Sequence, residues 1–228
     1  MLNLHHMNIG VKDVLKRINL FFILYLLLLC ACLVVKLIYT KEEIYFAVNR
    51  YYHGFADFFF KYATYFGDGL LTIAIAVILL CFFSYRKAFL LVSSYAVTSI
   101  FAQILKHFFD APRPQLYFAT RLGEIHFVEG VEIYKLHSFP SGHSVTVFST
   151  AVVLAYFSGK KPVNLLLLII AILTGYSRMY LSEHFFEDVV AGSAIGVLLT
   201  VVWLSWIESK KFLHAKKWNT ALFKKKGR

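Results

Sequence analysis

The chain has 228 residues, of which 59% are hydrophobic, and its mean hydropathy is positive at +0.64. Soluble domains average about 45–50% apolar residues, so this composition argues against an ordinary soluble protein and indicates a membrane protein. The net charge of +11 would suit either nucleic acid or a membrane surface. The three cysteines lie in apolar runs without metal-ligand spacing, which argues against a disulfide framework or a zinc site.

Six apolar stretches follow one another along the chain. They lie at about residues 18–37, 68–85, 88–107, 143–159, 162–180 and 188–207. A helix needs about 20 residues to cross a bilayer, and no stretch alternates apolar and polar residues as a strand would. We therefore predict an all-α protein: residues 1–228 form a single domain, a six-helix transmembrane bundle. No small-residue cleavage site follows the first stretch, so we expect that span to be retained.

The basic residues predict how the bundle is oriented. Fifteen of the 24 Lys and Arg residues lie in the two tails and in short loops at residues 86–87 and 160–161. By the positive-inside rule, both termini are cytoplasmic. The C-terminal tail, with its run of lysines at 224–226, is then a membrane-surface and orientation signal. We expect no nucleic-acid partner, because the tail has no nucleic-acid-binding fold around it.

Three short blocks place charged and polar groups at the ends of the predicted spans. The blocks are Lys106 with Arg113, then Ser141, Gly142 and His143, and then Arg178, His184 and Asp188. In the predicted topology all three fall on the non-cytoplasmic face. Charges at a membrane boundary are costly and mark functional sites. The blocks therefore predict one site at that face.

The first two blocks have the chemistry of a phosphate site. Arg113 offers a planar fork to two phosphate oxygens, and Lys106 adds a compact positive charge. Ser141 is a good N-cap for the helix that follows, and helix N-termini bind anions. Each block alone also has a simpler explanation, an interfacial anchor for the first and a capped helix start for the second.

The third block supplies a nucleophile. His184 and Asp188 are four residues apart, which on a helix would place them on one face. A carboxylate on one imidazole nitrogen leaves the other free to attack phosphorus, forming a phosphohistidine. His143 can protonate the leaving oxygen and then activate water. The spacing shows neither a Mg²⁺ nor a Zn²⁺ site, so we expect no metal and no cofactor. An ordinary His–Asp surface pair is the alternative.

Together the blocks resemble a known family. The matching segments are Lys106-x6-Arg113-Pro114, Pro140-Ser141-Gly142-His143 and Ser177-Arg178-x5-His184-x3-Asp188. They are similar to the three signature blocks of the type 2 phosphatidic acid phosphatase superfamily, the lipid phosphate phosphatases. The resemblance implies a metal-independent site near the outer surface of a six-helix bundle. It implies a catalytic set of His184 as nucleophile, Asp188 as its partner and His143 as acid/base. It implies a phosphate-binding set of Lys106, Arg113, Ser141, Gly142 and Arg178. Phe185-Phe186 stands where many relatives have an aromatic-Pro pair.

The resemblance predicts a bacterial inner-membrane phosphatase whose lipid phosphate substrate enters from the bilayer, with the site facing the periplasm or exterior. Candidate substrates are undecaprenyl diphosphate, phosphatidylglycerol phosphate, phosphatidic acid and lipid A phosphates. A lipid phosphotransferase is the first alternative, an anion transporter the second, and a haloperoxidase is disfavoured by the membrane spans. We expect the loop at residues 115–139 to lie over the site, and Gly192 and Gly196 to let the sixth span pack closely.

Overall fold

The computed structural model describes residues 10–223, and within that range every regular element is helical. The helices are α1 (Val11–Arg17), α2 (Asn19–Ile38), α3 (Lys41–Asn49), α4 (Gly54–Ala63), α5 (Gly69–Phe82), α6 (Tyr85–Phe109), α7 (Pro114–Tyr117), α8 (Gly142–Ser158), α9 (Lys161–Tyr180) and α10 (Phe186–Glu208). The 3-10 turns are η1 (Thr64–Gly67), η2 (Leu122–Glu124), η3 (Lys211–His214) and η4 (Lys216–Asn219). The all-α prediction is confirmed. The lysines at 224–226 lie outside the described residues.

Each predicted span coincides with a helix of the structure. Among the described residues, α2, α6, α9 and α10 are long and apolar enough to cross a membrane. A fifth crossing results if α4 and η1 form one span with α5, from which they are bent by 55°. Helix α8 is apolar but has 17 residues. Large apolar side chains of α2, such as Leu27 and Leu37, are exposed. A soluble monomer rarely exposes apolar patches of this kind, so the chain is a membrane protein.

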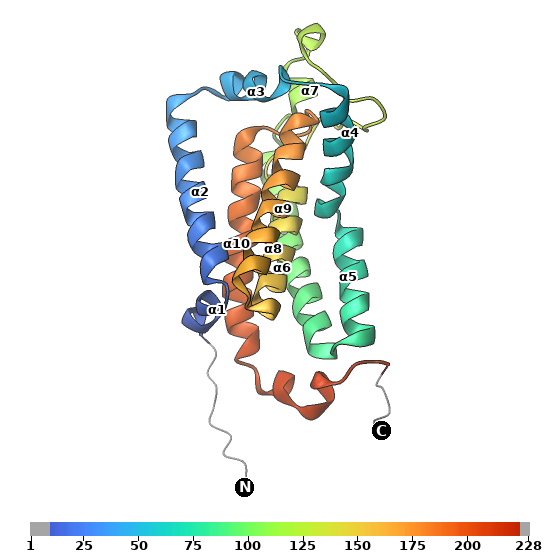
Figure 1. Cartoon of the computed structure of the whole chain (residues 1–228). Coiled ribbons are helices and arrows are strands. Elements are labelled where there is room, and N and C mark those ends of the chain that lie inside the picture. Colours follow the sequence, from blue (N-terminus) through green and yellow to red (C-terminus); the bar gives the residue numbers. More distant parts are fainter. Residues whose placement is uncertain (1–9, 224–228) are drawn as a thin grey trace.

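Helix α8 forms the centre of the bundle and packs against α6, α9 and α10 (Figure 1). Most of its side chains are buried, and Val152, Val153 and Ala155 are fully inaccessible. Helices α3, α4 and α7 lie at one end of the bundle, at the top of Figure 1, and the segment after α10 lies at the other. The starts of α8 and α10 and the ends of α6 and α9 therefore meet at the end that carries α3, α4 and α7.

Two glycines allow α10 to approach α8 closely. A Cβ atom on Gly192 would lie 2.6 Å from the backbone oxygen of Ser141, and one on Gly196 would lie 2.7 Å from that of Val145. Real Cβ atoms do not make such contacts, so the prediction of close packing at these glycines is confirmed. The approach lets the backbone N–H of Ser141 donate to the backbone oxygen of Asp188 over 2.9 Å.

The chain bends sharply between η1 and α5. Asp68 ends the first segment and caps the second, because its Oδ1 accepts from the backbone N–H of Leu70 over 2.9 Å. A Cβ atom on Gly67 would lie 2.8 Å from both Cβ and the backbone oxygen of His143. Turn η1 therefore packs directly against the first turn of α8.

Candidate functional site

A cavity of about 320 Å³ lies at the end of the bundle where the three sequence blocks meet. Six of the eight predicted site residues line it: Lys106, Arg113, Gly142, His143, Arg178 and His184. The other two, Ser141 and Asp188, are buried behind this surface. Blocks that are distant in sequence are thus brought to a single site.

The last part of the loop at 115–139 forms one wall of the cavity. Arg113 has an extended backbone, and its Nε donates to the backbone oxygen of Leu136 over 3.0 Å. Nζ of Lys106 donates to the backbone oxygen of His137 over 3.2 Å. The ring of Tyr134 lies 5.2 Å from the Arg113 guanidinium and lines the cavity. The loop holds two of the cavity's cations in place, so its predicted position over the site is confirmed for this part.

The earlier part of the loop packs away from the cavity, against α3 and α4. Arg121 pairs with Glu42 over 3.0 Å, and His126 pairs with Asp57 over 3.0 Å. His126 does not line the cavity. These contacts anchor the loop, so only its last residues contribute to the site.

Glu183 joins the two arginines of the site, and the sequence reasoning missed it. Its Oε2 accepts a hydrogen bond from Nη1 of Arg113 and forms an ion pair with Nη2 of Arg178 over 3.2 Å, and its side chain is only 1% exposed. Burial raises the pKa of the Glu183 carboxyl, while the guanidinium groups of Arg178 and Arg113 act in the opposite direction. In the sequence, only its position marks Glu183 as a candidate site residue: it is an acidic residue directly before the predicted nucleophile and follows the end of an apolar stretch.

Arg178 keeps one donor unpaired beside the cavity. Its Nη1 donates to Oγ1 of Thr64 over 2.6 Å, and its Nη2 is held by Glu183. Its Nε is buried without a hydrogen-bond partner. Buried donors without partners are rare in native proteins and often mark a site completed by a ligand. Arg178 is thus a cavity-lining arginine with one buried donor that no described residue satisfies.

His184 and Asp188 are paired, but not in the way the spacing predicts. The prediction that both lie on one face of a helix is wrong, because α10 begins at Phe186 and His184 lies in the preceding turn. That turn includes Ser182 at φ 58°. Asp188 instead turns back to cap α10, and its Oδ2 accepts from the backbone N–H of Phe185 over 2.9 Å. The same Oδ2 lies 3.5 Å from Nδ1 of His184.

Ser138 is a second residue that the sequence reasoning missed. Its Oγ donates to Oδ2 of Asp188 over 2.5 Å and lies 3.5 Å from Nδ1 of His184. Its side chain is fully buried. Ser138 and the backbone N–H of Phe185 therefore both hold Oδ2 of Asp188, and the Nδ1 side of the imidazole faces this oxygen. The other ring nitrogen, Nε2, is left for chemistry in the cavity.

The surroundings of His184 keep its imidazole neutral. Burial lowers the pKa of His184 well below its usual value of 6.5, and the positive charges of Arg113, Arg178 and Lys106 lower it further. A neutral imidazole has a free lone pair and can act as a nucleophile at neutral pH. The same cations that would hold an anion thus keep this histidine unprotonated.

The first turn of α8 presents backbone donors and His143 to the cavity. Ser141 is the N-cap of α8, and its Oγ accepts from the backbone N–H of Ser144 over 3.4 Å. Gly142 and His143 line the cavity. A helix N-terminus carries free N–H groups and a partial positive charge. The serine hydroxyl shapes this turn from behind, while the turn itself faces the cavity.

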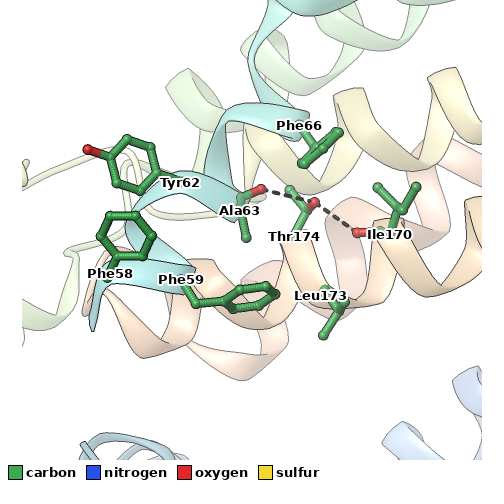
Figure 2. Close-up of a pocket in the computed structure, with 8 residues that line it drawn as sticks. All are labelled: Phe58, Phe59, Tyr62, Ala63, Phe66, Ile170, Leu173 and Thr174. Carbon is green, nitrogen blue, oxygen red and sulfur yellow. Dashed lines mark hydrogen bonds between the residues drawn. The ribbon is translucent and has the colours of Figure 1, made fainter. Parts of the chain in front are cut away.

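A second, smaller hollow lies on the outside of the bundle between α4, η1 and α9 (Figure 2). It is lined by Phe58, Phe59, Tyr62, Ala63, Phe66, Ile170, Leu173 and Thr174. The hydroxyl of Thr174 donates to the backbone oxygens of Ile170 and Ala63. Among the described residues that line this hollow none is charged and none is a histidine, whereas the first cavity has both kinds of residue.

Comparison with known families and proteins gives consistent matches. The sequence model of the PAP2 superfamily matches residues 87–212, more than half of the chain. Phosphatidylglycerophosphatase B of Bacillus subtilis (strain 168) is 33% identical over 129 residues, which cover 51% of this chain and 58% of that protein. That match spans little more than half of the relative's length. Undecaprenyl-diphosphatase of Sulfolobus acidocaldarius is 28% identical over 202 residues, which cover 82% of this chain and 88% of that protein.

Two solved structures share the arrangement of helices. LpxE of Aquifex aeolicus superposes with a TM-score of 0.63 at 29% identity, covering 72% of this chain and 93% of that one. The transmembrane PAP2-type phosphatidylglycerolphosphate phosphatase of Bacillus subtilis superposes with a TM-score of 0.60 at 26% identity, covering 87% of this chain and 99% of that one. The likeness therefore extends over most of the chain.

Proposed function

Since the chain belongs to the PAP2 superfamily, we propose that it is an integral membrane phosphatase that removes a phosphate group from a lipid. One observation carries the proposal: a single cavity is lined by three cations, two histidines and the start of α8. The relatives named as phosphatidylglycerophosphatase and undecaprenyl-diphosphatase support a lipid substrate. Undecaprenyl diphosphate, phosphatidylglycerol phosphate, phosphatidic acid and lipid A phosphates all carry the group that such a site would bind.

In the first step, Nε2 of His184 attacks phosphorus in line with the bond to the lipid oxygen. A P–N bond forms, the P–O bond breaks, and His143 donates a proton to the leaving alkoxide. Asp188 and Ser138 orient the imidazole from its Nδ1 side and Asp188 stabilises its positive charge. In the second step, His143 takes a proton from water, whose oxygen attacks phosphorus while the P–N bond breaks. Inorganic phosphate and the neutral nucleophile result.

The phosphate oxygens are held by fixed positive groups. Lys106, Arg113 and Arg178 neutralise the charge that builds up on the equatorial oxygens in the transition state. The backbone N–H of Gly142 adds the partial charge of a helix N-terminus. Ser141 supports that turn through its cap. The reaction needs no metal, because these groups neutralise the negative charge on the phosphate oxygens.

We further propose that residues 1–228 form one membrane domain with six spans, at about residues 18–37, 68–85, 88–107, 143–159, 162–180 and 188–207. The excess of Lys and Arg in the tails and in the loops at 86–87 and 160–161 supports cytoplasmic termini. The cavity then opens at the non-cytoplasmic face, in a bacterial inner membrane toward the periplasm or exterior. The lipid would reach it from the bilayer.

The purified protein in detergent tests this proposal through phosphate release from phosphatidic acid and from farnesyl diphosphate. His184→Ala should lower kcat by at least about 10³-fold on every lipid that the wild type hydrolyses, because it removes the nucleophile. His107→Ala is the matched control: this exposed histidine follows Lys106 but does not line the cavity. Wild-type activity should persist in EDTA, and vanadate should inhibit as a mimic of five-coordinate phosphorus. Full activity in His184→Ala, or loss of activity in EDTA, would contradict the mechanism.

A further inference from the structure

The cavity continues beyond the cations into the bundle. On α6 its wall runs from Lys106 back to Tyr95, eleven residues or about 16 Å of helix. Four uncharged polar side chains line this inner part, Tyr95, Ser99, Gln103 and Thr146, together with the apolar residues Ala102 and Val145. A substrate whose phosphate lies among the cations would place its next chemical group against this polar wall.

One charged side chain lies in the inner part of the cavity, and it is negative. Asp68 lines the cavity, and its position is fixed because it caps α5. Its neighbours in sequence show where it lies. Gly67 contacts the backbone of His143, and a Cβ atom on Gly69 would lie 2.1 Å from the Tyr95 hydroxyl. Asp68 is therefore held between the histidine that we assign as general acid and the inner polar wall.

The cations have little charge to spare for a second phosphate group. Glu183 pairs with both Arg113 and Arg178, and Asp188 lies behind His184. Among the described residues that line the cavity, the cations are Lys106, Arg113 and Arg178. A phosphate monoester carries up to two negative charges, whereas a lipid diphosphate carries a further charged group on the leaving side.

We propose that Asp68 is a specificity-determining residue that restricts the site to lipids carrying a single phosphate on a neutral polar backbone, a glycerol or a sugar, and disfavours prenyl diphosphates. This inference rests on the proposed function. In the in-line geometry, the leaving group lies toward His143, so the second phosphate of a diphosphate would approach the Asp68 carboxylate. Like charges in a partly desolvated cavity repel strongly. A glycerol ester or sugar hydroxyl would instead hydrogen-bond to Tyr95, Ser99 or Gln103.

The test compares kcat/KM for phosphatidic acid, phosphatidylglycerol phosphate and lipid A with kcat/KM for farnesyl and undecaprenyl diphosphate. We expect the wild type to prefer the best monoester to either diphosphate by at least about tenfold. Asp68→Asn should raise the diphosphate-to-monoester ratio by about tenfold, which corresponds to the loss of roughly 1.4 kcal/mol of repulsion. Asparagine keeps the helix cap, and Asp68→Ser is a second neutral cap that should act in the same direction.

Asp110→Asn is the matched control. This carboxylate lies at the same end of the bundle but does not line the cavity, and its left-handed backbone at φ 38° suits asparagine. The diphosphate-to-monoester ratio of kcat/KM in Asp110→Asn should equal that of the wild type. Equal or better hydrolysis of a diphosphate by the wild type, or an unchanged ratio in both Asp68 variants, would overturn the inference and leave the phosphatase function standing. No phosphate release from any lipid would instead overturn the proposed function. The monoester that the wild type hydrolyses with the highest kcat/KM shows whether the preferred backbone is a glycerol or a sugar.

Discussion

Two buried carboxylates pair with arginine at opposite ends of the bundle, and their surroundings differ. At the end that carries α3 and α4, Glu183 bridges Arg113 and Arg178 in the cavity wall. At the other end, Glu208 closes α10 and pairs with Arg86 at the start of α6. Both glutamate side chains are only 1% exposed.

The two clusters differ in whether their polar atoms are satisfied. In the cavity wall, Oε1 of Glu183 and Nε of Arg178 are buried without partners. At the far end, neither Arg86 nor Glu208 has a buried side-chain atom without a partner. The backbone oxygen of Glu208 is also satisfied, because it accepts from the ring Nε2–H of His214 over 2.8 Å. Unsatisfied buried groups cost free energy that a purely structural pair avoids. The first cluster therefore carries a cost that the second avoids, and its two arginines line the cavity, whereas the second cluster joins two helix ends.

The largest contrast is expected when each cluster loses an arginine. Arg178→Ala should lower kcat/KM by about 10²–10³-fold, because it removes charge stabilisation from the transition state. Arg86→Ala should leave kcat/KM within about twofold but destabilise the protein by about 1–3 kcal/mol, since Glu208 stays buried without its partner. Phosphate release and thermal melting in detergent measure the two effects. A drop in kcat/KM for Arg86→Ala as large as that for Arg178→Ala would remove the distinction between the clusters.

A smaller contrast is expected when each carboxylate becomes an amide. Glu183→Gln keeps the size of the side chain but replaces the carboxylate with a neutral amide. The amide presents either an NH₂ group or a weaker acceptor to the two guanidinium groups, so both arginines should shift. We expect kcat to fall by about 10–100-fold while KM rises less than about threefold, as for a residue that positions groups acting in the transition state.

Glu208→Gln should show the opposite pattern, a melting point a few degrees lower with kcat and KM near those of the wild type. Glu183→Asp keeps the charge and should restore part of kcat. If Glu183→Gln lowered only the melting point, Glu183 would be a structural residue like Glu208.

Some of these features could be predicted from the sequence and others could not. The long apolar helices were predictable because apolar runs without charge have few alternatives, and α2 and α10 match their predicted ranges within two residues. The cavity-lining cations and histidines were predictable from block spacing and family resemblance. Glu183, Ser138 and Asp68 were not, because their importance comes from contacts between residues 46 to 76 positions apart, such as Ser138 with His184, Glu183 with Arg113, and Gly67, the neighbour of Asp68, with His143.

The pairing of His184 with Asp188 shows a second limit. A spacing of four suggested a helix face, yet the two residues meet because Asp188 caps α10 from its third position. Spacing alone does not distinguish a shared helix face from a residue in a turn that folds back on a capping carboxylate. The bend between η1 and α5 is similar, since it depends on Gly67 fitting against α8.

The smallest expected effect is a pH dependence of stability caused by the buried imidazole. The folded state lowers the pKa of His184 well below 6.5, so below that pH the unfolded chain binds a proton that the folded protein does not. Stability should therefore be fullest above about pH 6.5 and fall as the pH drops, with this group contributing at most about 1.4 kcal/mol per pH unit. His184→Gln removes the titrating group and should flatten the melting point between pH 5 and 6.5 relative to the wild type. An identical slope in the variant would mean that His184 is protonated in the folded protein, and an imidazolium of that kind lacks the lone pair needed to attack phosphorus.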